Sequence, residues 1–110
     1  MSTKDRHSLE AILEAISKIR RFTERHPDQD SFYSDDIAFD AVMMNFIVIG
    51  EMVTRISDEL KVANPQIEWN RIKGFRNLVA HDYFGIDAEE VWQIIKADLP
   101  KLEQTISQIG

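Results

Sequence analysis

The sequence contains no cysteine, and it has only four glycines, three prolines and three histidines among its 110 residues. Without cysteine there can be no disulfide and no thiolate metal site, which favours a reducing cytoplasm as the setting. The few glycines do not make a phosphate-binding loop, and the histidines lack the clustered ligands of a metal site. We therefore expect neither a metal nor another cofactor.

Long apolar runs are also missing. The longest apolar tract, residues 41–49, is interrupted by Asn45 and is too short to span a bilayer, so no membrane association is expected. Charged residues occupy positions 4–6, ahead of the apolar pattern, which argues against a signal peptide.

Positive charge is in the minority, since the formal net charge is −6. This balance argues against a protein that binds nucleic acid over its whole surface. Residues 69–81 are the exception, because they include Arg71, Lys73 and Arg76 and no acid. They predict a small cationic patch, enough for a few phosphates, although a merely solvated helix face would explain the charges equally well.

What the sequence does contain is helical periodicity, with apolar residues at spacings of three and four and no strand pattern. Residues 1–110 are expected to form one domain, an all-α, up-and-down bundle of four or five helices. The helices are expected at about residues 5–25, 34–63 and 69–82 and from about residue 87 onward. Pro27 ends the first helix, and residues 27–33 form a short polar connection. Asp87-x-x-Glu90 begins the last helix as a capping box, and Pro100 kinks or splits it.

The second of these helices is apolar on almost all sides over residues 37–53, so it must be buried on all sides. Three short neighbouring helices do not readily cover such a surface, which predicts a partner chain and hence a homodimer. Glu51 lies at the end of the apolar run and needs a cation to remain charged. Arg76 and Arg55 are the candidate partners, and an exposed Glu51 is the alternative.

Single residues elsewhere have simple structural interpretations. Trp69 is expected to anchor the core. Gly74, inside a helix, predicts close packing against a neighbouring element. His7 and His26, at the ends of the first helix, are expected to be plain surface residues.

The segment from Arg76 to Tyr83 gathers a permanent cation, an amide, an imidazole and a phenol within eight residues. On a helix, Lys73, Arg76, Asn77 and His81 share the polar half of the surface, opposite an apolar side. Tyr83 borders the two halves. The segment therefore predicts a polar site on one face of the third helix.

These groups suit RNA cleavage without a metal, in which the ribose 2′-oxygen attacks the adjacent phosphate. His81 can transfer a proton near neutral pH, and Arg76 can stabilise the charge that develops on the phosphate. Asn77 and Tyr83 can hold a phosphate or a sugar hydroxyl. The plain alternatives are a histidine favoured by the C-terminal dipole of a helix and an ordinary solvated arginine. The spacing between Arg76 and His81 is weak evidence for a site by itself, because Arg21 and the histidine five residues after it have the same spacing.

As a whole, residues 76–83 resemble the Arg-x4-His-x-Tyr signature of HEPN-domain ribonuclease toxins, specifically the HepT class. The flanking residues 65–74 and 84–87 are also similar, as is Gly50-Glu51 in the second helix. The resemblance spans nearly the whole chain, and every motif position is matched. It implies a HEPN-like bundle of four to five helices that forms a homodimer and cleaves RNA.

The resemblance also implies roles for single residues. Arg76 and His81 would be catalytic, with Asn77, Tyr83, Lys73 and Glu51 in support. The toxin would belong to a type VII toxin–antitoxin pair, whose antitoxin is a minimal, MntA-like nucleotidyltransferase. The antitoxin would neutralise the toxin by attaching AMP to Tyr83.

Two other functions fit the same residues. The chain could be a non-catalytic helical subunit that binds and positions a nucleotidyltransferase, or it could be a generic helical dimerisation module. A neighbouring nucleotidyltransferase gene would support the toxin and the subunit and disfavour the third possibility. A growth assay with and without His81 would separate the first two.

Overall fold

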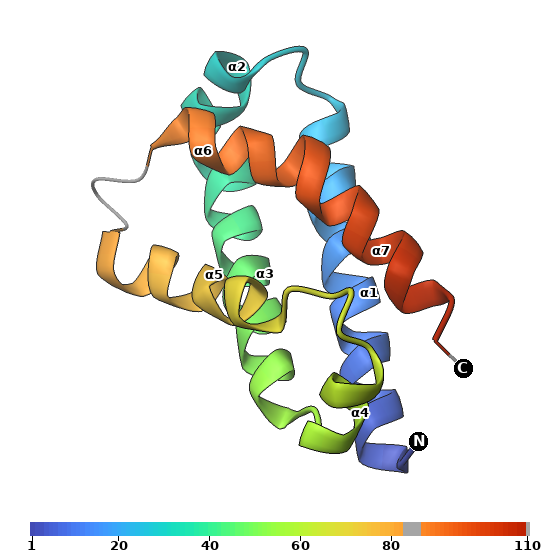
Figure 1. The fold of residues 1–110 in the computed structure, drawn as a ribbon. Coiled ribbons are helices and arrows are strands. Elements are labelled where there is room, and N and C mark those ends of the chain that lie inside the picture. The colour runs from blue at the N-terminus through green and yellow to red at the C-terminus, as the bar shows by residue number, and fades with distance from the viewer. Residues whose placement is uncertain (83–86, 110) are drawn as a thin grey trace.

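The computed structural model describes residues 1–82 and 87–109, with the side chains of residues 80–82 left out. Over these ranges the chain forms helices and no strand (Figure 1), so the expected all-α bundle is confirmed. In chain order the elements are α1 (Thr3–Glu24), α2 (Gln29–Ser34), α3 (Asp36–Arg55), α4 (Asp58–Ala63), α5 (Trp69–Asp82), α6 (Ala88–Gln93), a π-helical segment (Ile94–Asp98) and α7 (Leu99–Ser107).

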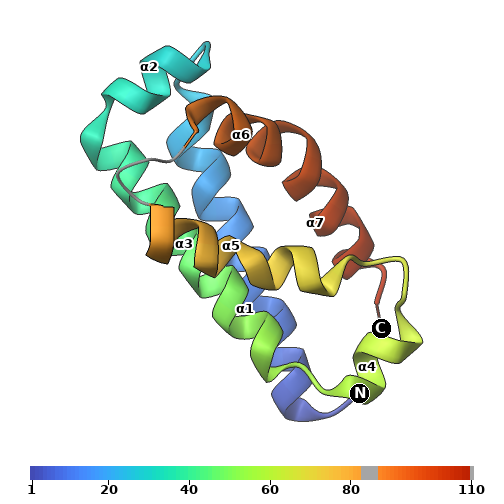
Figure 2. The same ribbon diagram turned by 60° about the vertical axis from the view of Figure 1, so that its left-hand side comes forward.

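The two long helices α1 and α3 run antiparallel and form the most extensive contact of the bundle. Helix α5 crosses the outer side of α3, at a steep angle to it (Figure 2). The continuous rod made by α6, the π-helical segment and α7 returns past α2 and packs along α1. Helix α5 therefore touches the core with one side only, and its other side remains free for a site.

Short polar side chains decide where several helices begin. Asp28 accepts a hydrogen bond from the Ser31 amide at 2.9 Å, and Asp35 accepts one from the Ala38 amide at 3.1 Å. These caps satisfy amides that have no partner within the helix. The expected connection at residues 27–33 therefore contains most of a helix, α2, and that expectation was wrong.

The single helix expected over residues 34–63 is also wrong, because α3 ends at Arg55 and the chain resumes as α4. Between the two helices Ile56 is extended and 4% exposed, so its side chain turns into the core. Ser57 then caps α4 by accepting a hydrogen bond from the Leu60 amide at 3.2 Å. The signal was present in the sequence as serine followed by two acids, a common helix start.

Ser57 also ties this corner to the beginning of α1. Its amide donates to Asp5 Oδ1 at 2.9 Å, and its hydroxyl donates to Asp5 Oδ2 at 2.6 Å. Asp5 is only 3% exposed. The Ser57 hydroxyl lowers the pKa of the Asp5 carboxyl, and the Ser57 amide acts in the same direction, although burial acts to raise that pKa. The buried carboxylate is thus kept charged and hydrogen-bonded.

Helix boundaries around the site match the expectations more closely. Helix α5 spans Trp69–Asp82, as predicted, and Trp69 is 9% exposed with its indole N–H donating to the Asn64 carbonyl at 3.0 Å. Asp87 caps α6 by accepting from the amides of Glu89 and Glu90. The distortion expected at Pro100 occurs one turn earlier, where the Leu99 amide donates to the Ile94 carbonyl in a π turn. The wider turn accommodates a proline that cannot donate to residue 96.

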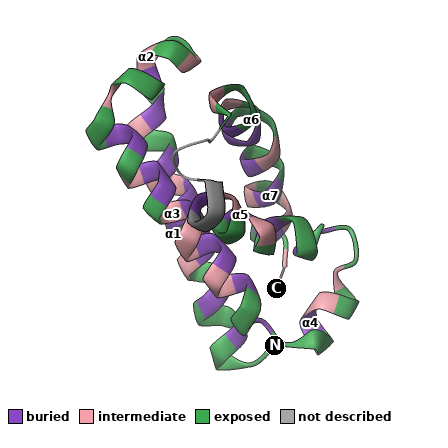
Figure 3. Cartoon of the chain, turned by 90° about the vertical axis from the view of Figure 1, so that its left-hand side faces the viewer, coloured by how far each residue is buried: buried purple, intermediate pink, exposed green. Residues whose placement is uncertain are grey.

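One face of α3 is not covered by the other described elements of the chain. Val42 and Phe46 are completely buried against the core, but Ile37 is 78% exposed and Met44 is 59% exposed. Val48 and Met52 are only half-buried, and Figure 3 shows exposed and intermediate residues along α3 beside the buried ones. The other helices of the chain therefore do not cover α3 on all sides, as the sequence predicts, and an apolar stripe is left along the helix.

By length and composition alone, α3 could cross a membrane, and it is the one helix of the described ranges that could. Its packing accounts for that composition in another way. One side of α3 is buried against α1, and a second side lies against α5. The helix is therefore the central core element of the bundle.

Candidate functional site

The site is organised by a close contact between α3 and α5. A Cβ atom placed on Gly50 of α3 would lie 2.7 Å from the Arg76 Cβ, 3.0 Å from the Arg76 nitrogen and 3.2 Å from the Lys73 carbonyl oxygen. Only glycine fits such an approach, because any other residue would force the two backbones apart. Gly50 therefore fixes where Arg76 sits on α3.

The residue after this glycine reaches the same arginine. Glu51 Oε1 lies 3.0 Å from the nearest guanidinium nitrogen of Arg76, so the ion pair expected with Arg76 or Arg55 forms with Arg76. The Arg76 side chain is 51% exposed and that of Glu51 is 35% exposed. The carboxylate holds one edge of the guanidinium, while much of the group stays open to solvent.

The faces of α5 are those that the sequence predicts. Ile72, Phe75 and Val79 are buried, and the Phe75 ring packs 5.4 Å from the Phe46 ring of α3, centroid to centroid. Lys73, Arg76 and Asn77 are exposed. Position 81 lies in the helical part of α5, one turn beyond Asn77, but the side chain of His81 and the whole of Tyr83 fall outside the described part of the structure.

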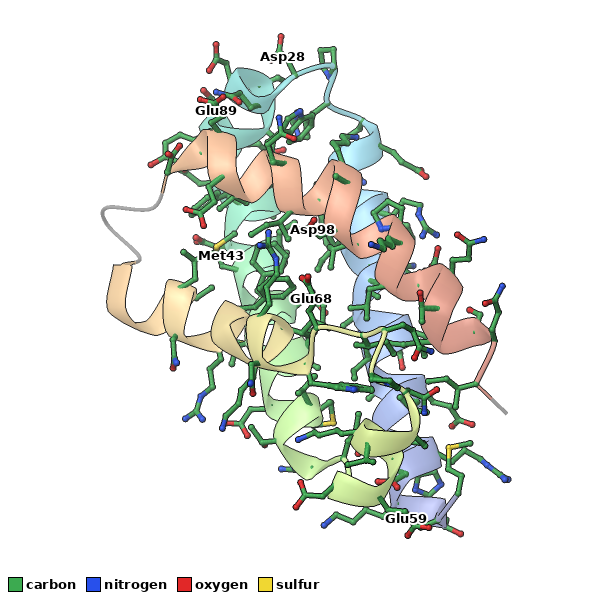
Figure 4. All side chains as sticks on the ribbon, viewed as in Figure 1. Asp28, Met43, Glu59, Glu68, Glu89 and Asp98 are labelled. Atoms are coloured by element: carbon green, nitrogen blue, oxygen red, sulfur yellow. The ribbon has the colours of Figure 1, made fainter. Side chains whose placement is uncertain are left out.

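The cationic patch predicted for residues 69–81 is smaller than its three charges suggest. Arg71 lies on another side of α5 and pairs with Asp98 at 2.6 Å and with Glu68 at 4.0 Å. Figure 4 labels these two acids. The hydrogen bond and the charge of Asp98 raise the pKa of the Arg71 guanidinium. Arg71 therefore serves mainly to join α5 to the rod that contains α7, and Lys73 and Arg76 are the charges left at the site.

Gly74 does not provide the close packing expected of it, because a Cβ atom there would meet nothing within 4 Å. The open space belongs to a groove between α5 and the beginning of the α6 rod. Its lining combines an apolar floor with polar edges and consists of Arg71, Gly74, Phe75, Asn77, Leu78, Glu90 and Ile94. We call it the Gly74 groove.

His26 is not a plain surface residue either. Its Nδ1 lies 2.7 Å from the Ser31 hydroxyl, and its Nε2 lies 3.2 Å from Asp35 Oδ2. The imidazole also meets the Phe32 ring edge-on, at 6.0 Å between centroids. These contacts help hold α1, α2 and the start of α3 together, and this corner lies at the far end of α3 from Gly50.

Within the part of the chain that the structure describes, no group of three or more histidine, cysteine or acidic residues is arranged to hold a metal ion. The residues that can act on a ligand near Gly50 are therefore a guanidinium, an ammonium group, an amide and a carboxylate. Arginine and lysine are suited to phosphate oxygens, and the amide can donate or accept a hydrogen bond. The arrangement suits a phosphate-containing ligand.

Comparison with known proteins agrees with this chemistry. The family model described as Ribonuclease HepT-like matches residues 12–109. The chain belongs to the HepT-like ribonuclease family. No solved structure matches it significantly.

Individual relatives cover most of the chain. A probable ribonuclease HepT of Thermococcus cleftensis is 33% identical over 103 residues, which are 94% of this chain and 93% of that protein. A predicted RNase of Methanocaldococcus jannaschii is 32% identical over 95 residues, 86% of each chain. A third relative, a gamma-glutamylcyclotransferase and predicted RNase of M. jannaschii, is 31% identical over 101 residues, but the chain spans only 45% of its length.

The sequence identified the motif residues, but it did not show why α5, the helix that carries them, lies where it does on α3. Gly50 was noted only through the resemblance, and the glycine singled out for close packing was Gly74. Both are single glycines inside helices, so their local sequence signals are alike. Only the crossing of α3 and α5 distinguishes them.

The two glycines give a matched pair of substitutions. Gly50→Ala should lower the free energy of unfolding by about 1–3 kcal/mol, because the new methyl group overlaps Arg76. Gly74→Ala should raise it by about 0.5–1 kcal/mol, because alanine favours the helix and meets open space. Urea unfolding followed by circular dichroism measures both. A Gly50→Ala protein as stable as the parent would contradict the close contact.

Proposed function

We propose that this chain is a metal-independent endoribonuclease toxin. The observation that carries the proposal is Arg76, seated against Gly50 and held by Glu51 at 3.0 Å, on a helix whose position 81 is histidine. Membership of the HepT-like ribonuclease family supports it. The substrate is RNA, because the reaction uses a ribose hydroxyl that DNA lacks.

In the proposed reaction a base takes the proton of the 2′-OH group, and the 2′-oxygen attacks the adjacent phosphorus. The bond to the 5′-oxygen breaks, and that oxygen receives a proton as it leaves. A 2′,3′-cyclic phosphate and a 5′-hydroxyl result. His81 transfers protons in this scheme, and Arg76 stabilises the negative charge that grows on the phosphate oxygens.

Neighbouring residues support these two groups. Glu51 acts as a positioning residue, because its ion pair limits the conformations of Arg76 and so reduces the entropy lost when the guanidinium binds phosphate. Lys73, one turn before Asn77, adds an exposed charge for a neighbouring phosphate. Asn77 positions a phosphate or sugar oxygen, and Tyr83, two residues after His81 in the sequence, contributes a phenol.

Replacement of the two catalytic residues tests the chemistry. His81→Ala and Arg76→Ala should each reduce RNA cleavage at least about 100-fold and relieve growth inhibition, because each removes a group needed in the transition state. Cleavage by the parent protein should persist in EDTA and leave cyclic-phosphate ends, as mapped by sequencing and mass spectrometry of the fragments.

Arg21→Ala is the control for this experiment, because Arg21 is exposed on α1 and has the same spacing to a histidine. It should cleave normally. Chelator-sensitive cleavage, or a His81→Ala protein with full activity, would contradict the mechanism. A folded protein that binds a nucleotidyltransferase and cleaves no RNA would instead be the non-catalytic subunit.

We further propose that a minimal nucleotidyltransferase antitoxin controls this site by adding AMP to Tyr83. The proposal rests on the motif tyrosine two residues after His81 and on the family. Each AMP would add a negatively charged phosphodiester and a bulky nucleoside to the motif that begins at Arg76. RNA phosphate would then be excluded by charge and by volume.

Mass spectrometry of protein co-expressed with such a nucleotidyltransferase should show adenylyl groups on Tyr83, and Tyr83→Phe should abolish them. Tyr33 is the internal control, because it is 42% exposed but lies on α2, where its ring packs edge-on against Phe39. Adenylylation at Tyr33 alone, or neutralisation of the toxin with Tyr83 unmodified, would contradict the proposal.

The working unit is proposed to be a homodimer formed through the apolar stripe of α3. Ile37, Met44 and Val48 recur at spacings of seven and four, which places them on one line of the helix. The same line continues to Glu51, the partner of Arg76. Burial of exposed apolar surface yields roughly 25 cal/mol per Å², so pairing of two stripes is favourable.

A dimer through this stripe would also complete the chemistry. Cleavage needs a base at the 2′-oxygen and an acid at the leaving oxygen, and each chain has one histidine in the motif. Because the stripe leads to the Arg76 site, a second chain on it would bring its own motif nearby. Two copies of His81 could then share the two proton transfers.

Met44→Asp should convert the dimer to monomer at micromolar concentration and abolish cleavage, because it places a charge in the middle of the stripe. Val62→Asp is the matched control, since Val62 is 78% exposed on α4, away from the stripe, and should leave the dimer intact. Sedimentation velocity measures both. A fully active monomer would contradict the composite site.

A further inference from the structure

The Gly74 groove lies beside the proposed catalytic residues but takes no part in the chemistry described above. We propose that it is a subsite for one nucleobase of the RNA, next to the cleaved bond, and that it prefers bases that carry an amino group over uracil. The inference rests on the ribonuclease function proposed above and extends it to the choice of substrate.

The shape of the groove suits a flat apolar ring. Its volume is about 320 Å³, at the lower end of the range of roughly 300–1,000 Å³ for small-molecule pockets. Phe75 and Ile94 are buried beneath it, and Leu78 is half-buried at its side. Gly74 contributes no side chain, and a Cβ atom placed on it would meet no neighbouring atom within 4 Å. A larger residue at this position would fill the groove.

The polar edges suit a base rather than a phosphate. Glu90 and Asn77 are exposed at the rim, and Arg71 is already paired with Asp98. A phosphate would meet the negative charge of Glu90 and a guanidinium that is largely neutralised. Single-stranded RNA bases, in contrast, are commonly recognised through hydrogen bonds to their edges and through contact with apolar or guanidinium surfaces.

The carboxylate of Glu90 gives the subsite its expected preference. Amino groups of cytosine, adenine and guanine can donate to a carboxylate, as cytosine does to acidic residues in nucleic-acid complexes. Uracil has one ring N–H between two carbonyl oxygens, and a carboxylate repels both oxygens. Asn77 can donate to a ring nitrogen or carbonyl oxygen of the same base.

The position of the groove relates it to the cleaved bond. Asn77 belongs to both the groove and the polar face of the motif. Position 81 follows Asn77 by one helical turn and Gly74 by two, which are separations of about 6 Å and 10 Å along the axis. A nucleotide adjacent to the cut can bridge such a separation. The base in the groove therefore belongs to a nucleotide beside the scissile phosphate.

The test uses the whole chain and a pool of short single-stranded RNAs with randomised bases, with the cut sites read by sequencing. The parent protein should disfavour uracil at one position next to the cut by about tenfold, in line with a base-edge contact. Gly74→Leu should remove this discrimination, because the side chain fills the groove. Gly74→Ala is the control for the backbone and should retain most of it.

A second pair of variants tests the carboxylate. Glu90→Gln should admit uracil, because an amide can donate to a carbonyl oxygen. Glu89→Gln makes the same change of charge one residue away, at an exposed position that does not line the groove, and should leave the preference unchanged. Circular dichroism confirms that each variant is folded.

Binding of fluorescent oligocytidine and oligouridine to His81→Ala protein provides a second readout that consumes no substrate. Gly74→Leu should reduce the affinity for oligocytidine to that for oligouridine. The subsite would be overturned if the parent, Gly74→Leu and Glu90→Gln proteins all showed the same relative affinity for the two oligonucleotides and the same base preference next to the cut, even if RNA is cleaved. Absence of cleavage together with a groove-dependent preference in binding would overturn the proposed activity and leave the subsite standing.

Discussion

The site depends on the contact in which α5 lies directly on Gly50 of α3. Because Gly50 has no side chain, the Arg76 Cβ approaches the α3 backbone more closely than any other residue at position 50 would permit. The same contact brings Glu51 to the guanidinium, so one glycine sets both the position of the arginine and its ion pair. The buried rings of Phe46 and Phe75 support the crossing from the core side.

Because α5 crosses α3 instead of lying alongside it, α3 is divided into three functional sides. One side is buried against α1, a second carries α5, and the third is the apolar stripe with Ile37 and Met44 exposed. Glu51 stands between the second and third sides. A partner chain on the stripe would therefore come close to Arg76, which links the proposed dimer to the proposed catalysis.

The net charge of the chain does not show how the charged side chains are arranged around α5. The chain is acidic, with a net charge of −6, yet acids near α5 are used in specific pairs. Asp98 and Glu68 engage Arg71 on one side of the helix, and Glu51 engages Arg76 on another. In the proposed function, Lys73 and the open part of Arg76 bind phosphate, and Glu90 lies at the edge of the proposed base subsite.

Periodicity and strong local signals at helix ends were enough to predict the all-α class, the extent of α5 and its polar face with Lys73, Arg76 and Asn77. The sequence also named Arg76 and Arg55 as candidate partners of Glu51, with an exposed Glu51 as the alternative. The short helices α2 and α4 were not predicted, because one or two turns have too few residues for a periodic pattern. Asp28 and Ser57 nevertheless mark their starts. Only the tertiary structure distinguished Gly50 from Gly74, paired Arg71 with Asp98 and placed His26 against Asp35. The first two depend on how helices distant in the sequence meet, and the third depends on how the chain turns around α2, so local residue patterns do not predict them.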